Sequence, residues 1–154
     1  MLTEDEKTEI QREIEQSEQP RAATVEALRI LQARHGWVSD EDIRNLAPLL
    51  GMTPDELDAV ATFYPFIFRR PVGRHVIFIC DSVSCWVMGY DALLRRLKER
   101  LGISMGETTP DGRFTLLPVS CIGACDRAPA LIIDRDLHVD LDPEKLDRLL
   151  ERYE

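Results

Sequence analysis

Four cysteines constrain the fold of this chain more than any other feature, because they form two close pairs that lie far apart in the sequence. Cys80 and Cys85 form a C-x4-C pair, Cys121 and Cys125 form a C-x3-C pair, and 35 residues separate the pairs. Each pair lies in a loop that follows a stretch with the hydrophobic pattern of a strand. If the two strands are neighbours, both loops open at one end of the sheet and the four thiolates converge.

Four converging thiolates select a soft metal, which is zinc, copper(I) or the iron of an iron–sulfur cluster. Zinc sites usually use tighter spacings and often include histidine. A C-x4-C loop suits a wider object with two irons, because each iron of a [2Fe–2S] cluster takes two cysteines. The spacing therefore favours an iron–sulfur cluster, with a zinc site and a disulfide or inert cysteines as the alternatives.

The rest of the composition narrows the class of protein. Hydrophobic residues make up 44% of the chain, which is enough for a core, and the net charge of −9 argues against nucleic-acid binding. No apolar run approaches the roughly 18 residues of a membrane span. The acidic first residues resemble neither a secretory signal nor a transit peptide. We therefore expect a soluble protein of a reducing compartment, where disulfides are rare.

Residues 1–70 carry the start and stop signals of four short helices. Thr3 with Glu6 forms a capping box, and Thr53 followed by proline and glutamate is a second start signal. Ser39 caps a third helix, and Gly36 ends the helix that begins near residue 22. Four short helices joined by brief loops predict a small bundle.

Two segments of this region have alternative interpretations. The first helix is expected to reach Gln19, and its thin apolar stripe, Ile10 and Ile14, is a candidate for packing against a partner. The aromatic segment at residues 63–71 is interpreted as the connection to the next domain, with a role in interdomain packing or as a partner surface.

From residue 71 the hydrophobic period falls toward two, which is typical of strands. Strands are expected at residues 75–79, 113–119, 130–133 and 137–141, and helices at residues 86–101 and from Asp142 onward. We therefore predict an α+β fold, in which a helical domain at residues 1–70 precedes a domain at residues 71–154 that has a four-stranded mixed sheet.

Several residues near the cysteines are candidates for supporting a cluster. Cys85 is expected just before the helix at 86–101, whose positive end would stabilise a thiolate. Asp81 and Asp126 would oppose an anionic cluster unless they point outward. The other candidates are hydroxyl donors, residues that bring backbone amides toward sulfur, and apolar shields: Ser82, Ser84, Ser120, Gly123, Ala124, Trp86 and Ile122.

Five segments together carry a resemblance to a known family: Val60–Tyr64, Pro71–His75, Cys80–Cys85, Asp111–Pro118 and Cys121–Asp126. In these segments the chain resembles the thioredoxin-like [2Fe–2S] ferredoxin family, which supplies a peripheral subunit of bacterial respiratory complex I (NADH:quinone oxidoreductase). The resemblance covers almost the whole chain. It implies a thioredoxin-like fold for residues 71–154.

The resemblance also implies a site, a cofactor and a partner. Cys80, Cys85, Cys121 and Cys125 would each ligate one [2Fe–2S] cluster. The cluster would exchange single electrons with the FMN of a partner subunit that also holds the NADH site. The assembly would lie on the cytoplasmic side of the bacterial inner membrane, and this chain would have no catalytic residue of its own.

The remaining motifs agree with a purely redox role and leave alternatives. There is no G-x-G-x-x-G segment after a strand, so NADH binding by this chain is not expected. His35, His75 and His138 are interpreted as structural. The alternative functions are the equivalent subunit of a NAD-linked formate dehydrogenase or hydrogenase and, in a different class, a zinc-stabilised interaction domain.

Overall fold

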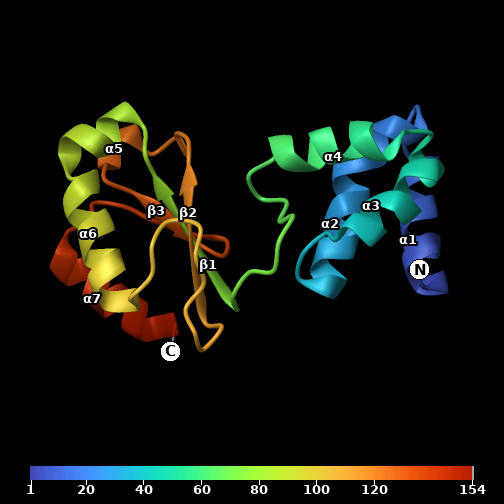
Figure 1. Ribbon diagram of the computed structural model, residues 1–154. Helices are drawn as coiled ribbons and strands as arrows, with labels where there is room; N and C mark the ends of the chain where they lie inside the picture. The colour runs from blue at the N-terminus through green and yellow to red at the C-terminus, as the bar shows by residue number, and fades with distance from the viewer. Residues whose placement is uncertain (154) are drawn as a thin grey trace. The chain divides into compact units, whose positions relative to one another are not determined.

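The computed structural model describes residues 1–153, which form two compact units, Met1–Pro71 and the chain from Val72 onward (Figure 1). The first unit is helical. Its elements in chain order are α1 (Glu4–Glu15), the 3-10 helix η1 (Pro20–Ala23), α2 (Thr24–His35), α3 (Asp40–Leu46), the 3-10 helix η2 (Ala47–Leu50) and α4 (Pro54–Phe63).

Short-range hydrogen bonds explain where the helices of the first unit begin. Complete capping boxes start α1, α3 and α4: in each, an N-cap hydroxyl accepts from the third helical amide and that residue's carboxylate accepts from the N-cap amide. Gly36 ends α2 in the left-handed conformation, at φ 82°. The three predicted starts are confirmed, whereas α1 ends at Glu15, earlier than expected, and η1 occupies the residues after Pro20.

The core of the first unit includes the apolar stripe of α1, which the sequence offered as a candidate for packing against a partner. Ile10 is fully buried, and Ile14 packs against the same cluster as Leu28, Leu31 and Leu46. The stripe therefore packs within its own bundle, and the prediction that it faces a partner is wrong. The reason is geometric, since α1 lies directly against α2 and η1.

The segment after α4 is also tied to the helices of this unit. The side-chain amide of Gln32 donates to the carbonyl of Phe66 at 2.9 Å and accepts from the amide of Phe68 at 2.6 Å. Ile67 is buried in the core, and the Arg69 guanidinium bonds Asp58 at 2.7 Å. Part of this stretch is thus packed against the helices, while Phe63, Tyr64 and Phe66 are exposed, so the role of the aromatic segment as a partner surface stays a prediction.

The second unit is a four-stranded mixed sheet with helices, and it confirms the predicted α+β fold class. Its strands are β1 (His75–Cys80), β2 (Phe114–Val119), β3 (Leu131–Ile133) and β4 (Asp136–His138), in the spatial order β2-β1-β3-β4. β1 is parallel to β2 and antiparallel to β3, and β3 is antiparallel to β4. The other elements are α5 (Val83–Met88), α6 (Tyr90–Leu101), the 3-10 helix η3 (Cys125–Arg127), α7 (Pro143–Leu150) and the 3-10 helix η4 (Glu151–Tyr153).

One predicted helix of this unit is in fact two. The helix expected at residues 86–101 begins earlier, at Val83, and is interrupted at Gly89, whose φ is 128°. Residues with side chains rarely adopt this backbone conformation, so the glycine permits the break between α5 and α6. The earlier start at Val83 places Cys85 inside a helix instead of before one.

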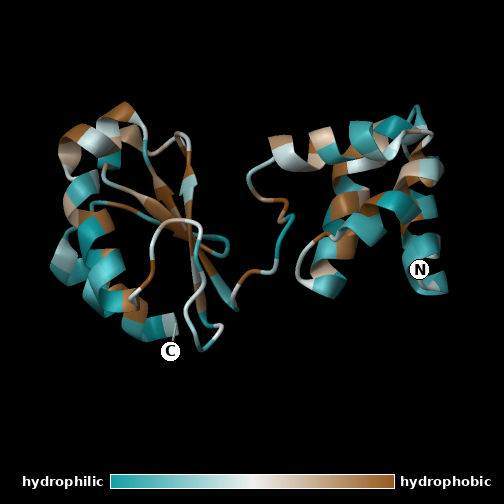
Figure 2. Cartoon of the chain, in the orientation of Figure 1, coloured by the Kyte–Doolittle hydropathy of each residue, from teal (hydrophilic) through white to brown (hydrophobic). Residues whose placement is uncertain are grey.

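Helices α6 and α7 lie side by side and share one core with the strands (Figure 1). Leu93 and Leu97 of α6 and Leu146 of α7 are buried against the sheet residues, which appear as the hydrophobic strands in Figure 2. Arg96 of α6 bonds Asp147 of α7 at 2.5 Å. Arg100 of α6 also pairs with Asp147, at 3.4 Å, so two arginines of α6 are paired within this unit.

Candidate metal centre

The parallel pairing of β1 with β2 brings the two cysteine loops to one edge of the sheet. Cys80, the last residue of β1, is in register with Val119, the last residue of β2. The next amide, that of Asp81, donates to the carbonyl of Val119 at 3.1 Å. Since parallel strands end at the same edge, the loops that carry Cys85 and Cys121 open on the same side. The predicted convergence depends on this neighbour relation, which the structure confirms.

The four sulfur atoms at this edge are grouped as two pairs with different exposure. Cys121 and Cys125 are exposed, and their sulfur atoms lie 3.2 Å apart. Cys80 and Cys85 are buried, hydrogen-bond each other, and pack with Ala128 and Ala130. Within residues 1–153 no three His, Cys, Asp or Glu side chains are arranged around a single metal position.

Backbone amides act on both pairs. The amide of Gly123 donates to the Cys121 sulfur and is the main cause that lowers the pKa of this thiol. The hydrogen bond with Cys121 raises the pKa of Cys125, while the Ser84 hydroxyl acts in the opposite direction. Donors aimed at sulfur stabilise thiolate and, equally, the negative charge of a sulfur that ligates iron. The contribution expected from Gly123 and Ser84 is thus present in the structure.

Cys85 differs from its expected role. Burial raises the pKa of this thiol to about 11, and its hydrogen bond with Cys80 adds to the effect, although the backbone of Ala130 lowers it. The expected position of Cys85 before a helix is wrong, because Cys85 is the third residue of α5 and is 3% exposed, and burial dominates the pKa of its thiol. The Ala130 contact could not be read from the sequence, because it comes from the antiparallel pairing of β3 with β1.

The other candidates of this region divide into those that face the site and those that do not. Ile122 and Ala124 pack against the buried cysteines, so the shielding role of Ile122 remains a sound expectation. Trp86 is 59% exposed and packs in none of the described core clusters, so it does not cover the cysteines in this chain alone. Asp81 and Asp126 are exposed, as an anionic site requires.

The donor set fits a [2Fe–2S] cluster. Two cysteine pairs provide four soft thiolate ligands, and amide and hydroxyl donors are already directed at sulfur. The three histidines make their contacts elsewhere: His35 with Glu6, His75 with Asp134, and His138 with Tyr153. Their interpretation as structural residues agrees with these partners.

Ser84 provides a test of the donor set. We expect Ser84→Ala to lower the reduction potential of the loaded protein, because a donor to sulfur favours the more negative reduced state. Loss of one hydrogen bond of about 1 kcal/mol corresponds to about a fivefold smaller ratio of reduced to oxidised protein at a fixed potential. Redox titration followed by electron paramagnetic resonance measures this ratio. Ser84→Thr should restore it, and an unchanged ratio in Ser84→Ala would exclude the role.

Comparisons with known proteins agree with this geometry. Residues 10–154 match the thioredoxin-like [2Fe-2S] ferredoxin family. The E subunit of the NADH-quinone oxidoreductase of Pseudomonas aeruginosa is 48% identical over 99% of this chain and 92% of its own length. The protein of the same name from Escherichia coli K12 is 50% identical over 96% of this chain and 89% of its own length.

A solved structure gives the same result for the fold. An NAD+-reducing [NiFe]-hydrogenase in the H2-reduced state is 31% identical, with a TM-score of 0.71 over 84% of this chain and 22% of the hydrogenase chain. Within residues 1–153, no helix is both long and apolar enough to cross a membrane. On the match over residues 10–154 and the near full-length relatives, the chain belongs to the thioredoxin-like [2Fe-2S] ferredoxin family.

Proposed function

We propose that this chain is the electron-transfer E subunit of an NADH-quinone oxidoreductase and that Cys80, Cys85, Cys121 and Cys125 ligate one [2Fe–2S] cluster. The observation that carries the proposal is the opening of both cysteine loops at one sheet edge, in a chain that is 50% identical to a protein of that name. The bound cluster supplies one-electron chemistry. We assign the cluster to the domain at residues 71–154, after the helical domain at residues 1–70, and no catalytic residue to this chain.

The chain's own residues would hold and insulate the cluster. Cys80 and Cys85 anchor it from the buried side, while Cys121 and Cys125 lie on the exposed side. Electron exchange between proteins requires close approach, and the exposed pair provides a short route from the surface. The amide of Gly123 and the hydroxyl of Ser84 would stabilise negative charge on the sulfur atoms that hold the cluster.

The helix next to this edge provides a surface for the partner. Val83, Trp86, Val87 and Met88 of α5 are apolar and each is more than half exposed. Cys85 lies between them in the sequence, so a protein that covers α5 also approaches the cysteines. Exposed apolar patches mark interaction sites, and tryptophan and methionine are enriched in interfaces. We propose that the flavin- and NADH-binding subunit docks here.

The place of the assembly follows from the same proposal. As part of an NADH-quinone oxidoreductase, the chain would lie in the peripheral arm, on the cytoplasmic side of the bacterial inner membrane. The similarity to an NAD+-reducing hydrogenase favours a second candidate, in which the same module serves that enzyme. Co-purification separates the two, because it identifies the flavoprotein that accompanies this chain.

Activity of the isolated chain tests whether NADH oxidation belongs to the partner subunit. We expect the purified, cluster-loaded chain to show no NADH oxidation, because the NADH site and the flavin belong to the partner. Addition of the partner flavoprotein should allow NADH to bleach the visible absorption of the cluster. NADH oxidation by this polypeptide alone would contradict the assignment. A colourless chain with stoichiometric zinc after purification without oxygen would instead favour the zinc-stabilised interaction domain.

A further inference from the structure

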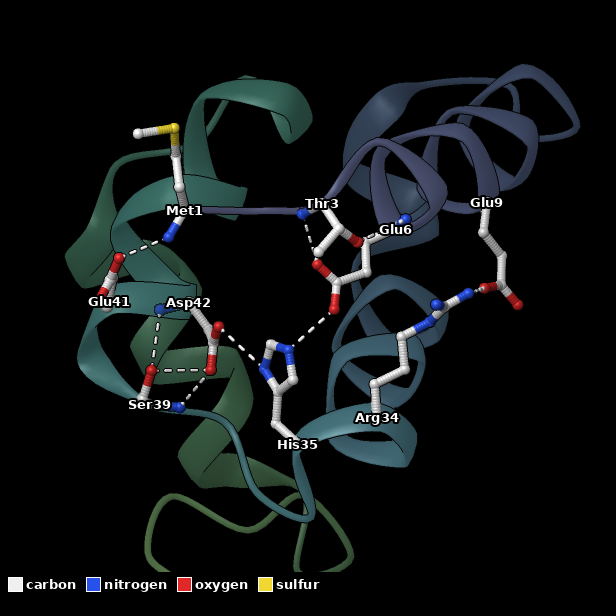
Figure 3. Close-up of polar contacts among 9 residues, drawn as sticks. All are labelled: Met1, Thr3, Glu6, Glu9, Arg34, His35, Ser39, Glu41 and Asp42. Carbon is white, nitrogen blue, oxygen red and sulfur yellow. Dashed lines mark hydrogen bonds and ion pairs between the residues drawn. The ribbon is translucent and has the colours of Figure 1, made fainter.

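His35, the last residue of α2, lies between two carboxylates from two other parts of the helical unit (Figure 3). Its Nε2 atom is 2.8 Å from Oε1 of Glu6 in α1, and its Nδ1 atom is 3.2 Å from Oδ1 of Asp42 in α3. Both carboxylates are buried, with Glu6 2% exposed and Asp42 7% exposed. The imidazole itself is 37% exposed, so water can deliver or remove its proton.

Both carboxylates are already held by their own helix starts. The second oxygen of Glu6 accepts from the Thr3 amide at 2.7 Å, and the second oxygen of Asp42 accepts from the Ser39 amide at 2.8 Å. The oxygen that faces His35 in each case has no freedom to turn away without breaking a capping box. A neutral imidazole has one donor and one acceptor nitrogen, whereas the protonated ring has two donors. Only the protonated ring satisfies both carboxylates.

We propose that His35 is a proton-operated latch, which in its protonated form ties α1 and α3 to the end of α2. Loss of one proton would leave a buried carboxylate oxygen facing a ring nitrogen that cannot donate, and buried unsatisfied polar groups are costly. The negative end of α2 also favours a cation at this position. The helical unit should therefore be less stable when His35 is neutral than when it is protonated. This inference does not depend on the cluster or on the proposed partner.

Two other cations lie near His35, and each has an acidic partner. Arg34 of α2 pairs with Glu9 of α1 at 2.6 Å, and its charge also interacts with those of Asp5 and Glu6. On the side of α3, Glu41 pairs with the N-terminal amino group at 2.6 Å. Arginine stays charged throughout, whereas the N-terminal amino group is an ionisable cation near α3. The test must therefore separate the amino group from His35.

Protonation of Glu6 and Asp42 should weaken the same contacts at low pH. Burial raises the pKa of Glu6, but hydrogen bonds from Thr3 and the charge of His35 outweigh it and leave the pKa below its ordinary value. The same balance, with Ser39 as the donor, lowers the pKa of Asp42. A carboxyl with a lowered pKa contributes stability above its unfolded pKa and loses it as pH falls through the folded one. Stability should thus decline on both sides of a maximum.

The test is chemical denaturation of the full chain between about pH 6 and about pH 9. In a Trp86→Phe background, Trp37 is the one remaining tryptophan, and it lies two residues after His35. We expect the folding equilibrium constant reported by Trp37 to fall about tenfold more in the parent than in His35→Gln over this interval, since one hydrogen bond to a charged group is lost. Both proteins keep the N-terminal pair, so the difference belongs to His35.

Two further measurements make the outcome decisive. His35→Arg keeps a charge and several donors, so its stability should change no more with pH than that of His35→Gln. Nitrogen-15 NMR of the unsubstituted chain should show protons on both ring nitrogens of His35 at the pH where the folded chain is most stable. Equal pH dependence in the parent and in His35→Gln would overturn the proposal. So would an unprotonated ring nitrogen at that pH, a result that does not require any variant to fold.

Discussion

Cys125→Ala should abolish cluster retention while leaving the fold of the chain intact. The substitution removes one of four soft ligands, and alanine offers no donor in its place. Cys125 is exposed and lies in the short 3-10 helix η3, so the loss of its sulfur creates no cavity in the core. We expect iron and acid-labile sulfide to fall at least about tenfold relative to the unsubstituted chain, together with the visible absorption, after purification without oxygen.

The adjacent residue provides a matched control. Asp126 is exposed in the same loop, and Asp126→Asn leaves all four sulfur atoms in place, so its cluster content should stay close to that of the parent. Far-ultraviolet circular dichroism confirms that both variants keep their secondary structure. Full iron and sulfide content in Cys125→Ala would show that Cys125 is not a ligand. Equal loss in both variants would show that the loop, and not the sulfur, determines retention.

Trp86→Glu should weaken binding to the flavoprotein partner by at least about 30-fold, without loss of the cluster. Tryptophan is the residue type most often found to dominate binding energy, with losses of about 2 kcal/mol or more on truncation. A carboxylate at this position would in addition have to be buried without a partner. Because Trp86 is largely exposed and does not pack with the buried cysteines, the cluster content should not change.

The affinity is measured by titrating the cluster-loaded chain with the flavoprotein in a calorimeter. Leu137→Glu is the matched control, because Leu137 is also an exposed apolar residue of this unit and the variant gains the same charge, but it lies on the edge strand β4. We expect the control to bind like the parent. Equal weakening in both variants would indicate a general effect of charge, and unchanged binding of Trp86→Glu would place the partner on another surface.

Much of the fold could be predicted because its signals are local. The capping boxes at Thr3, Ser39 and Thr53 involve residues three apart, so the spacing that forms each box is visible in the sequence. The end of α2 at Gly36 could also be predicted, because it depends only on a glycine that adopts the left-handed conformation at that position. Element boundaries were predicted wrongly where the same local pattern is compatible with two different structures. The apolar residues after Cys85 fit one long helix as well as two, and Gly89 selects two.

The site was predictable in its residues and less so in its environment. Sequence spacing and resemblance pointed to four cysteines, and the structure brings them to one edge. The burial of Cys85 and the contact with Ala130 depend on β3 lying antiparallel beside β1, a choice that no local signal encodes. The exposure of α5 was missed for the same reason, since apolar residues predict burial unless the surrounding fold is known.

By itself, the sequence predicted a centre of four thiolates, with an iron–sulfur cluster favoured over zinc, and it determined the beginnings of most helices, because ligand type and capping depend on residue identity over a few positions. Only the tertiary structure decided which strands are neighbours, which cysteines are buried, and that His35 meets Glu6 and Asp42. These facts depend on contacts between residues distant in the chain. Such contacts are selected by the burial and pairing energy of the whole unit, which no short window of residues contains.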